Sequence, residues 1–410
     1  MRPTSDDDAT IGARLRALRL WRHMTLAEVA GLSGVSAAYL SMVERGLRSL
    51  DRRSMISALA SALKVSDAEL TGGPPHMGTD SQQSGPHAAI PALRTALLTN
   101  SLWCPATADA RPVAELGAEM RAIEALYRRC DFVTIGQRLP TLIDELHVQA
   151  RPGAAEDVRE AALGDLIEAC ITASLMAKNL GYRDLAHVAA LRAEEAARVL
   201  GDPGALGKGA FLRFHTVPRE MTSWDRALVT AERAADALQP HADDLEAVSV
   251  LGLLTLSAAL AAAVLQRGPA VEHWLSESAA LAARVPDEMA SNWQCFCPAN
   301  VGIWRTTLAV ERGEGGGKVA ELAAAVDERK ISSQSRRAAF LVDVGRGVAR
   351  DPKARADAIR WMRRAEDAAP QYVRNSTPAR ETVAFLLNRC TSTAGGRELR
   401  GLAARMDVPH

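Results

Sequence analysis

Two short segments with apolar residues at helical spacing lie next to each other near the start of the chain, between Thr25 and Gly46. Gly34 separates them, and glycine suits a turn that needs a positive φ. Thr25 and Ser36 precede the two segments, where a hydroxyl can cap the first turn of a helix. The pattern therefore predicts two helices joined by a tight turn. Their expected inward-facing residues are Val29, Ala30 and Leu32 in the first helix and Leu40 and Val43 in the second.

Helical spacing continues on both sides of this pair and extends the prediction to five helices within residues 10–72. One helix is expected before the pair, from about Ile11 to His23, with Leu15, Leu18 and Trp21 facing inward. Two helices are expected after it, one from Arg53 to Leu63 and a short one capped by Ser66. Residues 1–9 are acidic and lack apolar periodicity, so we expect a disordered tail there.

The central pair has the arrangement of a helix-turn-helix, whose second helix enters the major groove of DNA. Its spacing, together with Glu44-Arg45-Gly46, resembles the Cro and lambda-repressor family, often called XRE. The resemblance covers residues 11–71. It implies a five-helix lambda-repressor-like domain that binds double-stranded DNA.

The resemblance also implies which residues face DNA. The first half of the second helix would face the bases, the N-termini of both helices would approach phosphates, and the following loop would approach the backbone. Alanine and methionine can contact a thymine methyl but cannot form bidentate hydrogen bonds, so we expect thin base readout supplemented by DNA shape. The candidates are Ala37, Ala38, Ser41 and Met42 for bases, Thr25 and Ser36 for phosphates, Tyr39 for a phosphate or for packing, and Arg45, Arg48 and Arg52 for the backbone.

Arg19 and Glu44 are implied by the same resemblance to form a structural pair. In the family, an arginine late in the first helix pairs with the glutamate that ends the third. Breaking such a pair leaves an uncompensated charge, at a cost of about 3–5 kcal/mol if the pair is well buried. We therefore expect Glu44 to hold the domain together and not to read bases.

Basic residues are concentrated in this predicted domain, although the chain as a whole has no net charge. Between residues 11 and 64, nine lysines and arginines stand against three acidic residues. A local basic excess is what phosphate binding requires. The near-neutral remainder therefore indicates that DNA contact is confined to this end of the chain.

The rest of the chain divides into a linker and a helical domain. Residues 73–91 are rich in Gly, Pro, Ser and Gln and predict a flexible linker. Over residues 92–410, amphipathic helices follow in pairs, and small residues recur at helical spacing in the second helix of several pairs. These sets resemble tetratricopeptide repeats with a degenerate consensus, and they predict six or seven pairs stacked as a right-handed solenoid. An irregular helical bundle is the alternative. The sets are Ala186, Ala190 and Ala193; Ala227, Ala231 and Ala234; and Ala358, Met362 and Ala365.

Composition favours an all-α protein of the cytoplasm. Aromatic residues make up only 4% of the chain, and six scattered cysteines do not form a disulfide framework. The N-terminus lacks the apolar core of a signal peptide. The longest apolar stretch, residues 248–265, contains serine, threonine and glycine, so we expect a buried helix and no membrane span.

No pattern in the chain predicts an enzyme, a cofactor or a metal site. Cys295 and Cys297 lack the spacing of a zinc site. The glycines of residues 313–317 follow a predicted helix and lack the lysine-hydroxyl pair of a phosphate loop. A turn between helices explains them.

Aromatic residues of the second domain are candidates for a ligand site. Half of the helices of a solenoid line a concave surface that commonly holds a peptide or small ligand, although an individual ring is more often a core residue than part of a ligand wall. The candidates are Phe211, Phe214, His215 and Trp304. The sequence thus predicts a DNA-binding transcriptional regulator, a homodimer whose solenoid senses a peptide or small molecule. The alternative is a protein-interaction scaffold or antitoxin-like protein with secondary DNA binding.

Overall fold

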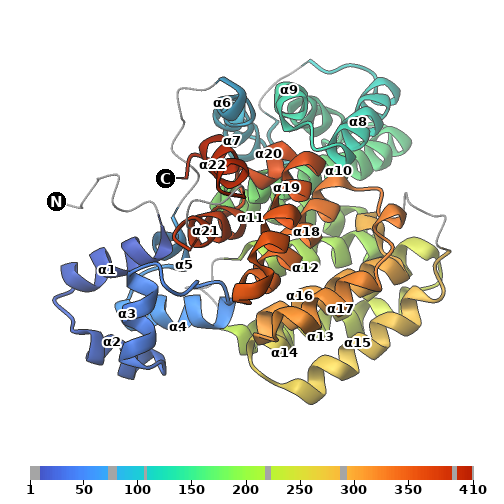
Figure 1. The fold of residues 1–410 in the computed structure, drawn as a ribbon. Helices are drawn as coiled ribbons and strands as arrows, with labels where there is room; N and C mark the ends of the chain where they lie inside the picture. The colour runs from blue at the N-terminus through green and yellow to red at the C-terminus, as the bar shows by residue number, and fades with distance from the viewer. Residues whose placement is uncertain are drawn as a thin grey trace.

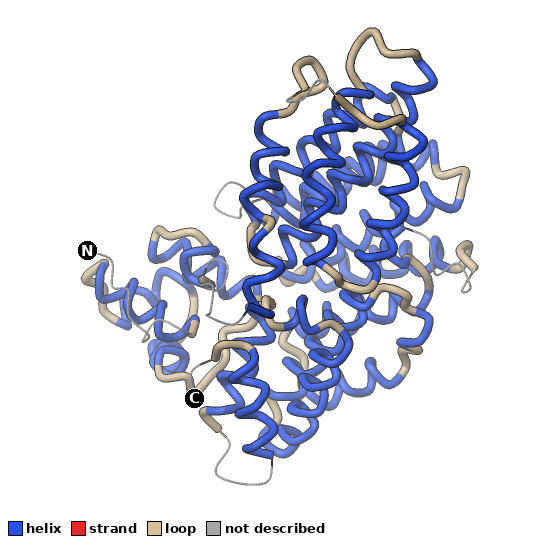
Figure 2. The backbone as a smooth tube through the Cα atoms, turned by 90° about the horizontal axis from the view of Figure 1, so that it is seen from above, coloured by secondary structure: helices blue, strands red, loops and turns tan. Residues whose placement is uncertain are grey.

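The computed structural model describes residues 10–72, 81–105, 109–217, 223–286, 293–389 and 395–408, and the expected all-α class is confirmed for them. A head, residues 10–72, lies beside a much larger body, residues 81–408, and the two touch along one side of the head (Figure 1). Helices dominate both parts in the view from above (Figure 2). The predicted tail, residues 1–9, lies outside the described residues.

Five helices form the head: α1 (Ile11–Trp21), α2 (Leu26–Ser33), α3 (Ala37–Glu44), α4 (Arg53–Leu63) and α5 (Asp67–Thr71). Thr25, Ser36 and Ser66 cap α2, α3 and α5 by accepting hydrogen bonds from backbone N–H groups of the first turn. Gly34 ends α2 at a φ of 71°, which a glycine adopts without strain. These local signals explain why the sequence predicts the head so closely.

The head has a hydrophobic core of its own, separate from that of the body. Leu15, Val29 and Leu40 are fully buried in it. Two expected core residues are not: Leu32 is 67% exposed and Trp21 is 50% exposed. Both lie near the ends of short helices, and the Trp21 ring is covered on one side by the Arg22 guanidinium, 4.6 Å from the ring centroid.

The body consists of helices joined mostly by short turns. Its first helices are α6 (Ser81–Ala88), α7 (Ile90–Thr99), α8 (Val113–Arg128), α9 (Phe132–Gln149), α10 (Glu156–Asn179), α11 (Arg183–Leu200), α12 (Pro203–Thr216) and α13 (Trp224–Leu238). The later ones are α14 (Leu245–Val264), α15 (Gly268–Ala282), α16 (Pro298–Arg312), α17 (Gly316–Ala324), α18 (Gln334–Ala349), α19 (Arg355–Ala368), α20 (Pro370–Val373), α21 (Thr377–Leu387) and α22 (Gly395–Arg405).

Most of these helices stack as pairs. The helices α8, α10, α12, α14, α16, α18 and α21 form one continuous row in which each contacts the next, and each also packs against the helix that follows it. Ala186, Ala190 and Ala193 of α11 are buried, as the small-residue pattern predicts for a second helix packed closely on its partner. The tetratricopeptide character of the stack remains a prediction.

The two ends of the stack meet. The backbone N–H of Phe132 donates to Oε1 of Gln371 at 2.8 Å, which joins α9 to α20. His87 of α6 lies within hydrogen-bond distance of Tyr182 Oη, at 3.0 Å, and of Asn375 Oδ1, at 2.9 Å. Part of the predicted flexible linker is therefore helical and fixed to the body, because α6 and the start of α7 fall within residues 81–91. Residues 73–80 lie outside the described residues.

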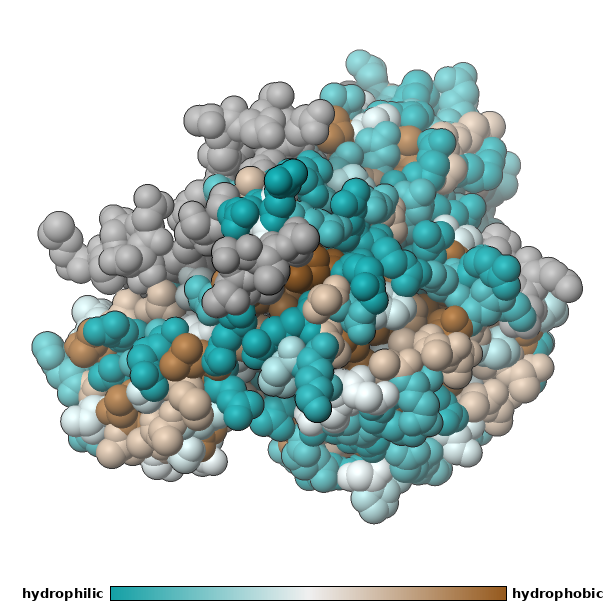
Figure 3. All heavy atoms as spheres, in the orientation of Figure 1, coloured by the Kyte–Doolittle hydropathy of each residue, from teal (hydrophilic) through white to brown (hydrophobic). Residues whose placement is uncertain are grey.

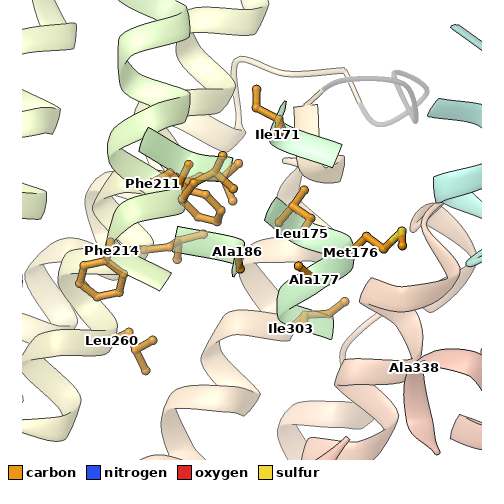
Figure 4. Close-up of a cluster of buried hydrophobic side chains, with 14 of the residues drawn as sticks. Ile171, Leu175, Met176, Ala177, Ala186, Phe211, Phe214, Leu260, Ile303 and Ala338 are labelled. Carbon is orange, nitrogen blue, oxygen red and sulfur yellow. The ribbon is translucent and has the colours of Figure 1, made fainter. Parts of the chain in front are cut away.

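The helix α14 is the centre of the body. It is long and apolar enough to cross a membrane, yet the helical window that meets this criterion is wholly buried inside the protein, which is typical of a core helix. Phe214 of α12 lies towards Leu260 of α14, whereas Phe211 lies towards Ile171 of α10 (Figure 4). The expected buried helix over residues 248–265 thus corresponds to α14.

Candidate nucleic-acid interface

The side of α3 that the XRE resemblance places against bases is accessible in this arrangement. Ala37 and Ala38 are exposed, and Ser41 and Met42 are half-buried. Ser36 Oγ accepts the N–H of Tyr39 at 3.1 Å and so fixes the start of the helix. The residues that the XRE resemblance places against bases therefore lie on one open face, and that face is poor in hydrogen-bonding groups.

A buried ion pair sets the position of α3 against α1. Arg19 Nε donates to Glu44 Oε1 at 2.6 Å and Arg19 Nη2 donates to Glu44 Oε2 at 2.8 Å. Arg19 Nη1 also donates to the carbonyl of Met24 at 3.0 Å. The hydrogen bonds that Arg19 donates to Glu44 raise the pKa of Arg19 above its ordinary value. Glu44 is fully engaged inside the head and cannot read a base.

Thr25 takes part in a capping box at the start of α2. Its backbone N–H donates to Glu28 Oε2 at 2.7 Å, and the N–H of Glu28 donates to Thr25 Oγ1 at 3.2 Å. Thr25 Oγ1 also donates to Glu28 Oε2 at 2.8 Å, and the two hydrogen bonds that Thr25 donates to this carboxylate hold the pKa of Glu28 below its usual value. A phosphate at this helix terminus would have to approach the Glu28 carboxylate, so Thr25 is a weaker phosphate candidate than Ser36.

Tyr39 forms a hydrogen bond with the loop that follows α3. Its hydroxyl donates to the carbonyl of Ser49 at 3.2 Å, and burial raises the pKa of the phenol. The sequence leaves two roles open for Tyr39, phosphate contact and packing, and these contacts favour packing.

The three candidate backbone arginines have different surroundings. Arg45 and Arg48 are exposed, and Arg45 Nε donates to the carbonyl of Ser41 at 3.2 Å. Arg52 is half-buried and faces the body: a Cβ on Gly313 would lie only 3.0 Å from its Nη1. Arg45 and Arg48 are thus available to phosphates, whereas Arg52 is engaged where the head meets the body.

The contact between head and body, here called the junction, has no signal in the sequence. Its polar contacts join residues that are 258 to 370 positions apart, so no local pattern could indicate them. On the head side lie α1, the α3–α4 loop and the start of α4, and on the body side lie α16, α18 and α21 with the residues that follow α18 and α21. The head residues with polar contacts to the body are Ile11, Arg14, Leu47, Asp51 and Arg53, and the body residues are Glu311, Arg346, Arg350, Glu381 and Arg389.

The four predicted ligand residues do come together. The His215 ring lies 4.4 Å from that of Phe211, 4.9 Å from that of Phe214 and 6.1 Å from that of Trp304, measured between centroids. Phe211, Phe214 and Trp304 are buried, because the segment before α16 packs against this face, with Trp293 5.2 Å from Phe211. The cluster is therefore mostly enclosed, unlike the open groove that the sequence suggests.

The same cluster holds donors that lack acceptors. Trp293 Nε1, Trp304 Nε1 and Arg336 Nη2 are buried and have no hydrogen-bond partner among the described residues. The Arg336 guanidinium lies 5.0 Å from the centroid of Trp304, and burial lowers its pKa. Burial also lowers the pKa of Lys178 to about 8, with Arg183 and Arg336 adding to the effect. This part of the body is thus rich in positive charge and donors.

Two other features of the body offer fewer groups that could bind a ligand. A groove of about 360 Å³ lies between α17 and α19, and its lining includes Gly316, Trp361 and Arg364 but none of the residues of the aromatic cluster. Cys295 Sγ lies 3.2 Å from Ser332 Oγ. Within the described ranges, no group of His, Cys, Asp or Glu is arranged to hold a metal ion.

Comparison with known proteins assigns the head to a class. Residues 10–71 match the family described as "Helix-turn-helix domain", so the chain carries a helix-turn-helix DNA-binding domain at its N-terminus. A stretch of 56 residues is 45% identical to the HTH-type transcriptional repressor RghR of Bacillus subtilis (strain 168). This similarity covers 14% of the present chain and 42% of that repressor. No solved structure matches the chain.

Proposed function

We propose that this protein is a DNA-binding transcriptional regulator of the cytoplasm whose body dimerises and senses a small ligand. One observation supports the proposal that the protein binds DNA. The helix-turn-helix is held rigidly by the Arg19–Glu44 pair and presents an exposed face on α3, flanked by the exposed Arg45 and Arg48. The protein RghR, which is similar to the head, is a transcriptional repressor, and this agrees with the proposal.

Side chains proposed to contact phosphates and side chains proposed to face bases should respond differently to substitution, which gives a first prediction. Arg48→Ala should weaken binding to all DNA sequences alike and reduce the slope of log affinity against log salt by about one unit, because one phosphate contact is lost. Met42→Ala should instead change sequence preference, since its side chain faces a base edge. Both are measured by fluorescence anisotropy on duplexes that the full-length chain selects from a random pool.

Arg22→Ala provides the matched control for this experiment. Arg22 is an exposed arginine of the head, but its Nη2 donates to the carbonyl of Lys64 at 2.9 Å, on the far end of α4. Its removal should leave the salt slope unchanged. Equal slopes for the Arg48 and Arg22 variants would show that the loop after α3 does not face DNA.

Dimerisation and ligand sensing are supported by separate features of the body. Trp103 and Leu98 are 72% and 55% exposed, the highest values for large apolar side chains of the body, and an apolar surface of this kind suits contact with a second copy. Two heads would then address half-sites about 34 Å apart. The unpaired donors of Trp293, Trp304 and Arg336 suit an anionic ligand with a flat apolar part, such as an aromatic carboxylate or a peptide carboxyl terminus.

Purification of the full chain from its native cells tests both features at once. Light scattering should give the mass of a dimer at micromolar concentration, and Trp103→Ser should give a monomer. Native mass spectrometry should show a small molecule or short peptide that Arg336→Gln releases. A stoichiometric protein partner in place of the ligand would favour the interaction scaffold, and a monomeric wild-type chain would rule out the dimer.

A further inference from the structure

The body holds the head by the loop between α3 and α4. Arg389 and Arg346 donate through Nη2 to the backbone carbonyls of Leu47 and Asp51. Arg350 donates to Asp51 Oδ2 through Nε at 3.1 Å and through Nη2 at 2.9 Å. This loop contains Arg45 and Arg48, the two arginines that we propose to contact phosphates. The body therefore binds the same loop that would contact DNA.

A carboxylate of the body occupies the N-terminus of α4. The N-cap residue, Arg52, supplies no side-chain hydrogen bond to the helix. Glu311 does so instead: its Oε2 accepts the N–H of Arg53 at 3.0 Å, and its Oε1 accepts Arg53 Nη1 at 2.7 Å. Glu311 is almost completely buried, with a side chain 1% exposed. Two oxygens of a negative group thus lie at the N–H and guanidinium of Arg53, an arrangement that a DNA phosphate could equally adopt.

The groups around Glu311 fix it in this position. Arg346, also buried, lies 3.5 Å from Glu311 Oε1 and 2.6 Å from Asp343 Oδ1. A second carboxylate, Glu381, accepts the N–H of Ile11 at 2.8 Å on the other side of the junction. The docked head is therefore held by one carboxylate of the body at the start of α4 and by another at the start of α1.

We propose that docking of the head on the body competes directly with DNA for the α3–α4 loop, so that the structure shows a DNA-inhibited state. This inference rests on the proposed function. In the docked state the side of α3 proposed to face bases stays open, but Arg53 is occupied by Glu311 and Arg52 lies against Gly313. Docking thus withdraws Arg52 and Arg53 from phosphate contact, while Arg45 and Arg48 stay exposed, and phosphate contacts supply much of the affinity for DNA.

The junction is suited to reversible docking. Head and body have separate hydrophobic cores, and the visible boundary between them carries mainly hydrophilic side chains (Figure 3). Undocking therefore exposes charged groups that water can solvate, and it opens neither core. A ligand that binds the undocked body better than the docked one would release the head.

Arginine variants of the body distinguish the effect of docking on DNA affinity from the effect of the lost positive charge. Arg350→Gln and Arg389→Gln each remove a positive charge, which by itself would weaken binding to DNA. If docking inhibits, each should instead bind the selected duplex about tenfold more tightly, because the head is released. Arg363→Gln is the matched control, since Arg363 is exposed on α19 and pairs with Glu398 and Asp367 within the body. Its affinity should not rise.

Hydrogen–deuterium exchange of the full chain gives an independent measure of docking. The amide of Arg53 should exchange faster in the Arg350 and Arg389 variants than in the wild type, and DNA should speed exchange at Ile11, whose N–H is held by Glu381. Faster exchange with unchanged or weaker DNA affinity would overturn the inference, and so would unchanged exchange. If no form of the chain binds DNA while exchange still rises, the proposed function fails although the docked contact is real.

Discussion

Replacing Glu44 with alanine is expected to unfold the head while the body remains folded. The change leaves the Arg19 guanidinium buried without its carboxylate partner, at a cost of about 3–5 kcal/mol. The head has only about sixty residues and a small core of its own, so a loss of this size takes most of its stability. Exchange of amides in residues 11–71 should become fast, DNA binding should be lost, and amides of α14 should remain protected.

Two further variants show whether the lost charge pair is the cause. Glu28→Ala removes an exposed carboxylate from the capping box of α2 and should destabilise the head much less than Glu44→Ala. The double variant Arg19→Met, Glu44→Leu replaces the pair with apolar side chains of similar size and should restore the head. A double variant as unstable as Glu44→Ala would show that the position requires the hydrogen bonds themselves.

Gly252→Val should destabilise the body more than any other small substitution. A Cβ at Gly252 would lie 1.9 Å from Cζ of Phe296, whose ring is completely buried, so neither side can give way. Overpacking of a core costs typically 1–3 kcal/mol and more where the neighbours are rigid, and we expect about 3 kcal/mol or more here. Urea unfolding followed by circular dichroism measures the loss of free energy of unfolding.

Gly164→Ala is the matched control for this substitution. Gly164 lies inside α10 and a Cβ there would meet no atom within 4 Å, so alanine should leave the body unchanged or stabilise it by about 0.5–1 kcal/mol. A second test combines Gly252→Ala with Phe296→Leu. If the ring is the obstacle, the double variant should be more stable than the sum of the two single changes indicates.

The sequence predicts the head well because its signals are local. Arg53 and Leu63 bound α4 as expected, and Thr25, Ser36 and Ser66 cap the helices that they precede. The errors have a common cause in long-range packing. The apolar spacing predicts that Leu32 faces inward. It cannot show that Val29 and Ala30 are the residues by which α2 packs on the core of the head, while Leu32 stays exposed.

Long-range contacts also explain what the sequence could not show about the linker and the site. The composition of residues 81–88 predicts a loop, but His87 is held by Tyr182 and Asn375 from distant helices. Arg52 resembles Arg45 and Arg48 in sequence, and only the position of the body reveals that it faces Gly313. The aromatic cluster follows from the predicted stack of helices, whereas its enclosure depends on the segment before α16.

The burial of α14 has a consequence for the synthesis of the protein. The helix is 20 residues long and apolar enough to cross a membrane, and its neighbours in the body cover its apolar window completely. On the ribosome, α12 and α13 emerge before it and can cover part of its surface at once. Its remaining partners, α15 and α16, are translated later. The interval between the emergence of α14 and that of α16 is therefore the stage of biosynthesis at which the chain is most exposed to mistargeting and to capture by chaperones.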